Sequence, residues 1–457
     1  MWLISSLLIV ITLAYLFTKE GISKTMFMPG ELSSGHHQLA DSCESCHTNK
    51  FGGDEVLQDA CINCHGDERV KPNDSHPRTK FKDPRNADTL EKINALHCVS
   101  CHVEHKPEIT LKDGLTQPID VCFHCHAQVA EERPSHEGMS FLTCKDSGCH
   151  NFHNNRALYT DFLVKHMDDP LHKDNPHLPA KEFSDVLDEI LEYPREKYPI
   201  EPLFTSHIDA PEDKRSDQKI VAEWEQSAHA KAGANCTACH QKVDVSESVN
   251  TWSDKPTVDN CQTCHTHEVD RFLKGKHGMR LQAGLSPMTP AQALLPMHSN
   301  ASHEELTCNS CHGAHSYDVN YAAVDACLQC HADDHSLAYK NSKHYALWLQ
   351  ESANTEHENQ GVSCASCHMP RIDYDVSEWT TRKLVDHNQS ANLSPNSKMI
   401  RSSCLHCHGL GFSIDSLADR ELIKNNFNGI SKVHVESIDL ARKDLERYLK
   451  EKQEANL

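Results

Sequence analysis

The chain has 457 residues, of which 38% are hydrophobic, and it carries a formal net charge of −21 with a mean hydropathy of −0.60. This acidic balance argues against nucleic acid and against an anionic membrane surface as partners, because both require basic patches. The length allows two or three domains, but the small hydrophobic share leaves little side-chain material for their cores.

The chain begins with an uncharged apolar run over residues 2–17, "WLISSLLIVITLAYLF". As a helix it would be about 24 Å long, slightly short of a typical hydrocarbon core of about 30 Å. A signal peptide is one interpretation. No basic residue precedes the run and no small-x-small cleavage site follows it. Both features favour an uncleaved signal anchor, formed by residues 1–18, rather than a signal peptide. Either interpretation places the rest of the chain outside the cytoplasm, so we expect a periplasmic protein tethered to the inner membrane.

All 22 cysteines fall into eleven motifs, so none remains for a disulfide or a nucleophile. Ten motifs read C-x-x-C-H, with the cysteine pairs Cys43 and Cys46, Cys61 and Cys64, Cys98 and Cys101, Cys122 and Cys125, Cys236 and Cys239, Cys261 and Cys264, Cys308 and Cys311, Cys327 and Cys330, Cys364 and Cys367, and Cys404 and Cys407. The eleventh has wider spacing, from Cys144 to Cys149. The histidines that end the motifs are His47, His65, His102, His126, His150, His240, His265, His312, His331, His368 and His408.

This pattern is the attachment signature of haem c, in which two thiols add to the porphyrin vinyl groups and the adjacent histidine becomes the proximal iron ligand. Zinc ribbons and redox cysteine pairs also use close cysteines, but they do not need a histidine at the same place every time. The sequence therefore predicts eleven covalently bound haem c groups. Five motifs share residues 43–150, a segment too short to bury enough side chains, so we expect the macrocycles to form the core and folding to be coupled to haem attachment.

The motifs divide the chain into a pentahaem module over residues 36–167 and a hexahaem module over residues 223–410. A proline-rich linker over residues 168–222 joins them, with one short helix expected over residues 184–193. The segment 411–457 is predicted to be helical, because apolar residues from Val435 to Tyr448 recur every three or four positions. That helix either packs on its own domain or joins two copies in a homodimer. No long alternating run appears, so we expect a mainly α fold with extensive loops and little β structure.

Each iron also needs a sixth ligand. Of the 35 histidines, the eleven in motifs leave 24, whereas the ten methionines cannot serve every haem, so most haems should be bis-histidine and low in potential. The predicted distal ligands stand shortly before or after motifs, and His97 and His124 compete with them. They are His37, His76, His105, His136 and His153 in the first cluster, and His229, His277, His303, His344, His357 and His387 in the second.

The first cluster resembles the small class III multihaem cytochromes and the pentahaem carriers that feed periplasmic reductases, through its motif density and interspersed histidines. The tail runs from "SKHYALWLQESANTEHENQGVSCASCHMPR" through "LVDHNQ" to "CLHCH". It resembles the last haems of ammonia-forming nitrite reductases and octahaem hydroxylamine oxidoreductases. That resemblance implies distal ligation by His357 and His387, and it places His344, before Trp348, at the active site of catalytic members.

Two features depart from the catalytic members of that superfamily. The nitrite reductases hold their catalytic haem with a lysine in place of the motif histidine, whereas all eleven motifs here end in histidine. Catalytic members also have a tyrosine soon after the motif that corresponds to Cys327. Here the residues "ADDHSLAY" put His335 in that region and Tyr339 farther along.

Two functions follow as alternatives. The first is electron transfer along eleven haems, between a quinol-linked donor such as a quinol dehydrogenase and a periplasmic acceptor such as a reductase. The second is an oxidoreductase in which one haem of the second cluster lacks a sixth protein ligand and acts on nitrite, hydroxylamine or a sulfur oxyanion. His344 and His335 would then be the pocket residues that donate protons or orient the anion.

Overall fold

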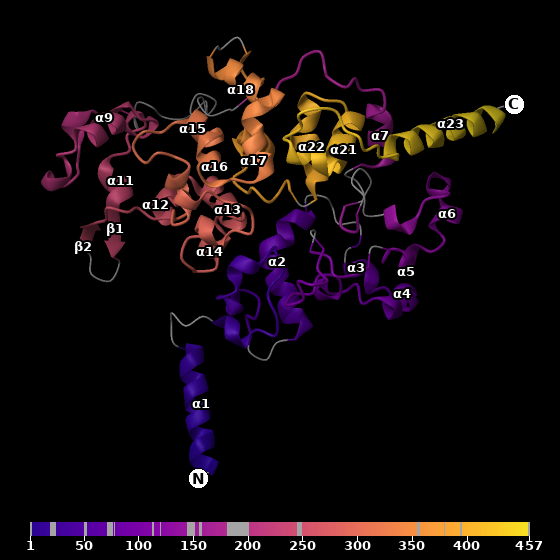
Figure 1. Cartoon of the computed structure of the whole chain (residues 1–457), viewed down its shortest axis with the longest axis horizontal. Helices are drawn as coiled ribbons and strands as arrows, with labels where there is room; N and C mark the ends of the chain where they lie inside the picture. Colours follow the sequence, from indigo (N-terminus) through magenta and orange to yellow (C-terminus); the bar gives the residue numbers. More distant parts are fainter. Residues whose placement is uncertain are drawn as a thin grey trace. The chain divides into compact units, whose positions relative to one another are not determined.

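The computed structural model describes residues 2–18, 24–49, 53–70, 76, 78–111, 114–118, 120–143, 151–154, 158–180, 201–244, 249–353, 357–378, 380–393 and 395–455. The chain divides into two compact units, and Figure 1 labels the helices and strands of the chain. Unit 1 comprises Met1–Tyr159 with Met279–Ser286, and unit 2 comprises Thr160–Gly278 with Pro287–Leu457. The module and linker boundaries expected from the motif spacing remain predictions.

Unit 1 is built from short helices joined by loops and 3₁₀ turns. Its helices are α1 (Trp2–Thr18), α2 (Asp54–Val70), α3 (Arg78–Phe81), α4 (Ala87–Lys92), α5 (Phe123–His126), α6 (Val129–Glu132) and α14 (Met279–Gln282). The last belongs here because Arg280, only 8% exposed, donates to the carbonyl oxygen of Gln38 at 2.7 Å.

Unit 2 has more helices and two hairpins. The helices are α7 (Thr160–His166), α9 (Gln218–Gln226), α10 (Ala228–Lys231), α11 (Cys236–His240), α12 (Val258–Gln262), α13 (Thr266–Lys274), α15 (Val319–Ala323), α16 (Asp325–Cys330), α17 (Asp334–Ala338), α18 (Lys343–Ala353), α19 (Cys364–His368), α20 (Met399–Ser402), α21 (Leu410–Ala418), α22 (Arg420–Lys424) and α23 (Ser437–Ala455). The antiparallel hairpins pair β1 (Gln241–Asp244) with β2 (Val249–Trp252), and β3 (Arg371–Ser377) with β4 (Thr380–Val385). This confirms the predicted mainly α fold with extensive loop.

Many motifs begin a helical turn at their first cysteine. The side chain of Asn235 accepts from the backbone of Cys236 at the start of α11, and Ser363 accepts from Ser366 at the start of α19. Short polar side chains at this position satisfy backbone N–H groups that a helix start leaves without partners. The local sequence thus sets the turn that carries the cysteines.

The side-chain core is unevenly distributed between the two units. In unit 2, Ile400, Leu410 and Ile414 are at most 1% exposed and pack where α20, α21 and α22 meet. In the described part of unit 1, the buried apolar side chains are those of Ala60, Phe81 and Leu158. Burying one large apolar side chain contributes about 1.5–3 kcal/mol, whereas ordering each backbone residue costs about 1–2 kcal/mol. Side chains alone therefore cannot hold unit 1 together.

The first part of the proline-rich segment packs within unit 2. The backbone N–H of Lys173 donates to the carbonyl oxygen of Cys407 at 2.9 Å, and that of Leu178 donates to Asn359 at 2.7 Å. A Cβ on Gly409 would clash with the carbonyl oxygen of Pro170, so this close approach requires glycine. The short helix expected over residues 184–193 lies outside the described residues.

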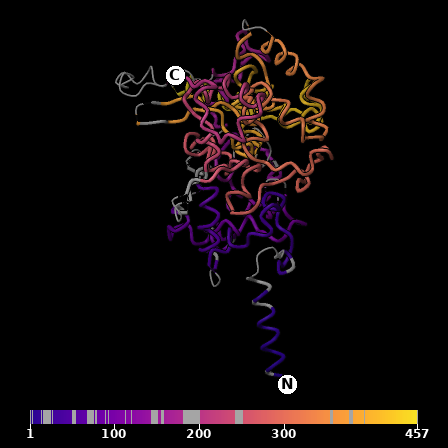
Figure 2. Tube along the Cα trace, turned by 90° about the vertical axis from the view of Figure 1, so that its left-hand side faces the viewer, coloured from indigo at the N-terminus to yellow at the C-terminus, as the bar shows by residue number. Residues whose placement is uncertain are grey.

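The two terminal helices differ in their surroundings. Helix α1 is one uninterrupted helix (Figure 2). Its apolar side chains Trp2, Ile4 and Val10 are exposed. Among the described helices, none has the length and apolar character needed to cross a membrane. Helix α23 contacts α7, where Arg442 donates to Asp168 at 2.9 Å and Ala441 is buried, while Tyr448 farther along is 57% exposed.

Candidate haem sites

Each well-described motif closes one turn between its first cysteine and its histidine. The backbone N–H of the histidine donates to the carbonyl oxygen of the first cysteine at 2.8 Å for His47 and His408 and at 3.0 Å for His312 and His331. This turn presents two thiols and an imidazole within one short segment, as attachment to a single macrocycle requires. None of the twenty described cysteines forms a disulfide. The motif from Cys144 to His150 lies outside the described residues.

Nine motif histidines each face a second imidazole at nearly constant distance, with ring centroids 5.9–6.3 Å apart. The pairs, motif histidine first, are His65 with His36, His126 with His76, His102 with His153, His265 with His229, His240 with His315, His331 with His277, His312 with His387, His368 with His335, and His408 with His344.

This spacing fits an iron ion between the rings. Two imidazole nitrogens that bind a metal at about 2 Å each lie about 4 Å apart, which sets the ring centres roughly 6 Å apart. Some other ring contacts of these histidines are shorter, at 4.6 Å from His240 to Trp252 and 4.9 Å from His408 to His172, whereas contacts with phenyl rings, such as His76 with Phe81, also lie at 6.2 Å. The donor set and its spacing therefore fit bis-histidine haem.

Six of the eleven histidines expected as distal ligands stand opposite a motif histidine. They are His76, His153, His229, His277, His344 and His387. In three further pairs, the structure brings His36, His315 and His335 to this distance. Distal ligation by His37, His303 and His357 stays a prediction.

The first and fifth motifs have no such pair in the described part of the chain. His47 makes no ring contact there with another imidazole, and His150 is among the residues left undescribed. The expectation that His105 and His136 serve as distal ligands remains a prediction.

Local spacing gives one signal for a facing imidazole that sequence reasoning did not single out. His315 follows His312 by three residues in "CHGAH", as His105 follows His102 in "CHVEH". This repeated H-x-x-H step favours His315 over His303. No comparable signal separates His36 from its neighbour His37.

Hydrogen bonds orient many of these imidazoles. The Nδ1 atoms of His76, His335 and His387 contact the backbone carbonyl oxygens of Phe152, Ile423 and Val385 at 2.6, 2.5 and 3.0 Å. Motif histidines show the same contact, at 3.0 Å from His102 to Gly114 and at 2.7 Å from His240 to Ser253. When Nδ1–H donates to a carbonyl, the lone pair of Nε2 points away from it and is free to bind a metal.

Burial keeps several of these imidazoles neutral. The pKa values of His277, His344 and His368 are each lowered to about 4. Burial is the main cause, and the imidazole that faces each of them is the second cause. The neutral imidazole is the form that ligates a metal.

Consecutive motifs lie against one another. The thiols of Cys61 and Cys98, of Cys261 and Cys308, and of Cys327 and Cys364 are in hydrogen-bond contact, which raises the pKa of the first thiol in each pair. Element contacts agree for the first pair, since α2 packs on the turn Cys98–Ser100, and they add the motifs of Cys236 and Cys261, since α11 packs on α12. These consecutive motifs are therefore spatial neighbours within their units.

A carboxylate stands behind one of the facing imidazoles. Oε1 of Glu104 lies 2.6 Å from Nδ1 of His36 and accepts from the hydroxyl of Ser33 at 2.8 Å, while Oε2 accepts from the Ser33 backbone N–H at 2.8 Å. Burial alone would raise the pKa of Glu104. The hydrogen bonds from His36 and Ser33 outweigh burial and lower the pKa to about 2, so the carboxylate is ionised.

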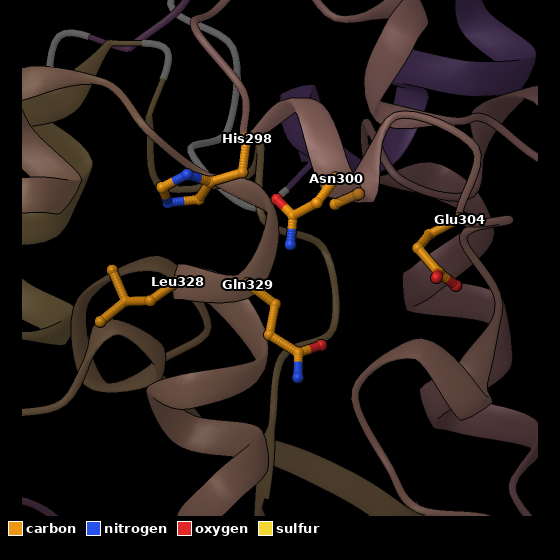
Figure 3. A pocket seen from close by; sticks show the side chains of 6 residues that line it. His298, Asn300, Glu304, Leu328 and Gln329 are labelled. Carbon is orange, nitrogen blue, oxygen red and sulfur yellow. The ribbon is translucent and has the colours of Figure 1, made fainter.

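A pocket of about 410 Å³ lies beside the motif from Cys327 to His331. Figure 3 shows the side chains of His298, Asn300 and Glu304 around it, with Leu328 and Gln329 from α16. The backbone N–H of His298 donates to the carbonyl oxygen of Cys330 at 2.8 Å. Among the described residues, no group of three or more His, Cys, Asp or Glu side chains is placed to hold a metal ion.

Two comparisons match known proteins, and both matches are to cytochromes. The family model for cytochrome c3 matches residues 35–127, which include the first four motifs. The multiheme cytochrome MtrA of Shewanella baltica (strain OS185) is 25% identical over 199 residues, or 37% of this chain and 50% of that protein. The chain thus spans about half the length of this relative. No solved structure matches.

The two comparisons support a multihaem c-type cytochrome that carries covalently bound haem c and transfers electrons. Cytochromes of this kind are typically periplasmic or extracellular.

Proposed function

We propose that this protein is an electron carrier with eleven haem c groups, passing electrons between a quinol-linked donor and a periplasmic acceptor. The nine imidazole pairs are the observation that carries this proposal. An iron bound by two imidazoles and a porphyrin has no position left for a substrate, so these sites are suited to electron transfer and not to substrate turnover. When bound, haem supplies reversible one-electron exchange.

The proposed distal ligands combine the nine facing imidazoles with two of the sequence predictions. His105 would serve the first haem and His136 the fifth. Two observations support the assignment of His105. Its Nδ1 lies 2.9 Å from the carbonyl oxygen of Gly30, and the distal histidines His76, His335 and His387 make the same kind of contact with a backbone carbonyl. Its backbone is also held at a φ of 63°. Non-glycine residues seldom adopt this conformation, and it persists where the surrounding structure imposes it.

Electrons would move along each unit in chain order. Support comes from the contacts between consecutive motifs, such as Cys61 with Cys98 and Cys327 with Cys364, because thiols in contact hold their macrocycles close together. The acceptor would be a periplasmic reductase and the donor a quinol dehydrogenase.

The N-terminal helix would tether the protein to the inner membrane. Its apolar side chains are largely exposed, with Trp2 at 88%, Ile4 at 67% and Val10 at 60%, and such a surface favours an apolar environment. Seventeen helical residues span about 25 Å, close to the hydrocarbon thickness of about 30 Å. The exposed end of α23 around Tyr448 and Leu449 could join two copies.

The oxidoreductase alternative required an open haem in the second cluster beside His344 and His335. Both imidazoles face a motif histidine, His408 and His368 respectively, at distances that suit ligation. This arrangement favours the carrier.

Electron paramagnetic resonance of the oxidised protein tests the proposal, together with a haem count by mass spectrometry. We expect eleven attached haems, all low-spin, with spectra that do not respond to nitrite, hydroxylamine or sulfite. A high-spin signal that amounts to about one haem and changes on adding one of these anions would instead establish the oxidoreductase.

A further inference from the structure

The imidazole of His36 differs from other facing imidazoles in the group behind it. Its Nδ1 lies 2.6 Å from the Glu104 carboxylate, whereas the Nδ1 atoms of His76, His335 and His387 lie against neutral backbone carbonyls. A hydrogen bond to an ionised acceptor is about twice as strong as one between neutral groups. It also shifts negative charge onto the imidazole.

The carboxylate is held in place from several directions. Ser33, which is 5% exposed, donates to both of its oxygens through the backbone N–H and the hydroxyl. The neighbouring residue His105 contacts the carbonyl oxygen of Gly30, and a Cβ on Gly30 would clash with the His105 carbonyl oxygen. Residues 30–36 are therefore packed tightly on the loop after the third motif, which fixes the distance between Glu104 and His36.

We propose that Glu104 is a positioning residue that acts through His36 to lower the reduction potential of the haem attached at Cys61 and Cys64. The inference rests on the proposed ligation of that haem by His65 and His36. Ferric iron carries one more positive charge than ferrous iron, so a more electron-rich imidazole stabilises the ferric state. This haem would be reduced after the haems whose distal imidazoles donate to backbone carbonyls.

The test compares Glu104→Gln with Glu108→Gln in the full-length haem-loaded protein. The first substitution keeps a hydrogen-bond acceptor on a side chain of the same size but removes the charge. Glu108 is exposed and lies four residues after Glu104. Its substitution by glutamine removes one negative charge, as Glu104→Gln does, but at a residue that does not contact a proposed ligand. There are two readouts: a redox titration monitored at the Soret band, and the low-spin signals in electron paramagnetic resonance. A purely structural role would not shift the potential or the low-spin signal of one haem alone.

In Glu104→Gln we expect one one-electron component to shift to higher potential. The ratio of reduced to oxidised haem at fixed ambient potential should rise about tenfold, which corresponds to about 59 mV. One low-spin signal should change its principal values while the others stay unchanged. Glu108→Gln should titrate as the wild type.

Glu104→Asp is the second variant, with the charge retained but the side chain one methylene shorter. We expect its affected component to lie between those of the wild type and Glu104→Gln. Only a variant that assembles with full haem content is used for this comparison. If the potential in that variant is the same as in the wild type, the inference is overturned. The variant His36→Ala tests separately whether His36 is a haem ligand at all. One haem becoming high-spin in His36→Ala upholds ligation by His36, whereas eleven low-spin haems would refute it.

Discussion

His315 faces His240 with ring centroids 6.0 Å apart and ring planes only 12° from parallel. Nδ1 of His240 contacts the carbonyl oxygen of Ser253 at 2.7 Å, which directs its Nε2 away from that carbonyl. The pair joins two elements far apart in the chain, α11 and the loop after the motif that ends at His312. An iron between these rings would be saturated.

His315→Ala should therefore convert one haem from low-spin to high-spin, because alanine cannot bind iron. Electron paramagnetic resonance of the oxidised protein measures the change, and mass spectrometry checks that the haem count is unchanged. His303→Ala is the matched control, since His303 is an exposed histidine nearby in the chain. If His303→Ala produced the high-spin haem and His315→Ala did not, the assignment would revert to His303.

Unit 1 should not fold without its haems. The described part buries only Ala60, Phe81 and Leu158 among apolar side chains, which together contribute less than about 10 kcal/mol. That is small beside the backbone entropy of well over a hundred residues, at about 1–2 kcal/mol each. Protein made in cells that lack haem attachment should be cleaved by protease throughout residues 24–159.

Residues 399–424 of unit 2 offer an internal comparison of protease resistance in the same experiment. Ile400, Leu410, Ile414 and Leu422 form a side-chain core there, so residues 399–424 should resist protease longer than unit 1. Equal protection of both segments in haem-free protein would show that the macrocycles are not the core of unit 1.

Asp386→Asn should strongly destabilise unit 2. Nε and Nη2 of Arg271 donate to the two oxygens of Asp386 at 2.8 Å each, and the side chains are only 13% and 6% exposed. Removing one partner leaves a buried charge, at a cost of about 3–5 kcal/mol in the free energy of unfolding. Because His387 follows directly, the haem that it is proposed to ligate should also show a changed low-spin signal.

The control for this change lies in the adjoining hairpin. Asp373 in β3 pairs with Lys383 in β4, and the Asp373 side chain is 66% exposed. Exposed pairs contribute about 0–1 kcal/mol, so Asp373→Asn should lower the denaturant midpoint little. Equal losses from the two substitutions would contradict a special role for the buried pair.

Replacing residues 1–18 by a cleavable signal peptide should release the protein from the membrane fraction into the soluble periplasmic fraction. The reason is that α1 carries the exposed apolar surface of Trp2, Ile4 and Val10. Fractionation followed by haem staining measures the distribution, with intact protein as the reference. Retention of the truncated form in the membrane would assign the attachment to another part of the chain.

The mainly α fold was readable from the sequence, and so was the local turn of the ten described motifs, because both depend on local spacing. Two residues between cysteines and a histidine directly after them define one turn, and the structure shows that turn at Cys43, Cys308 and Cys404. The thin core of unit 1 was likewise predictable from composition and motif density.

The pairing of each motif histidine with a facing imidazole was not readable in this way, because only the folded chain brings the two rings together. His36 and His37 are adjacent and chemically identical, yet only His36 lies opposite His65 with Glu104 behind it. His335 stands across from His368 because α17 packs on α22, where Ile423 accepts its Nδ1–H. Local spacing thus determined the turns that present the cysteines and the motif histidine, and long-range packing decided which imidazole faces each of these histidines, since a facing ring is selected by its position in space and not by its position in the chain.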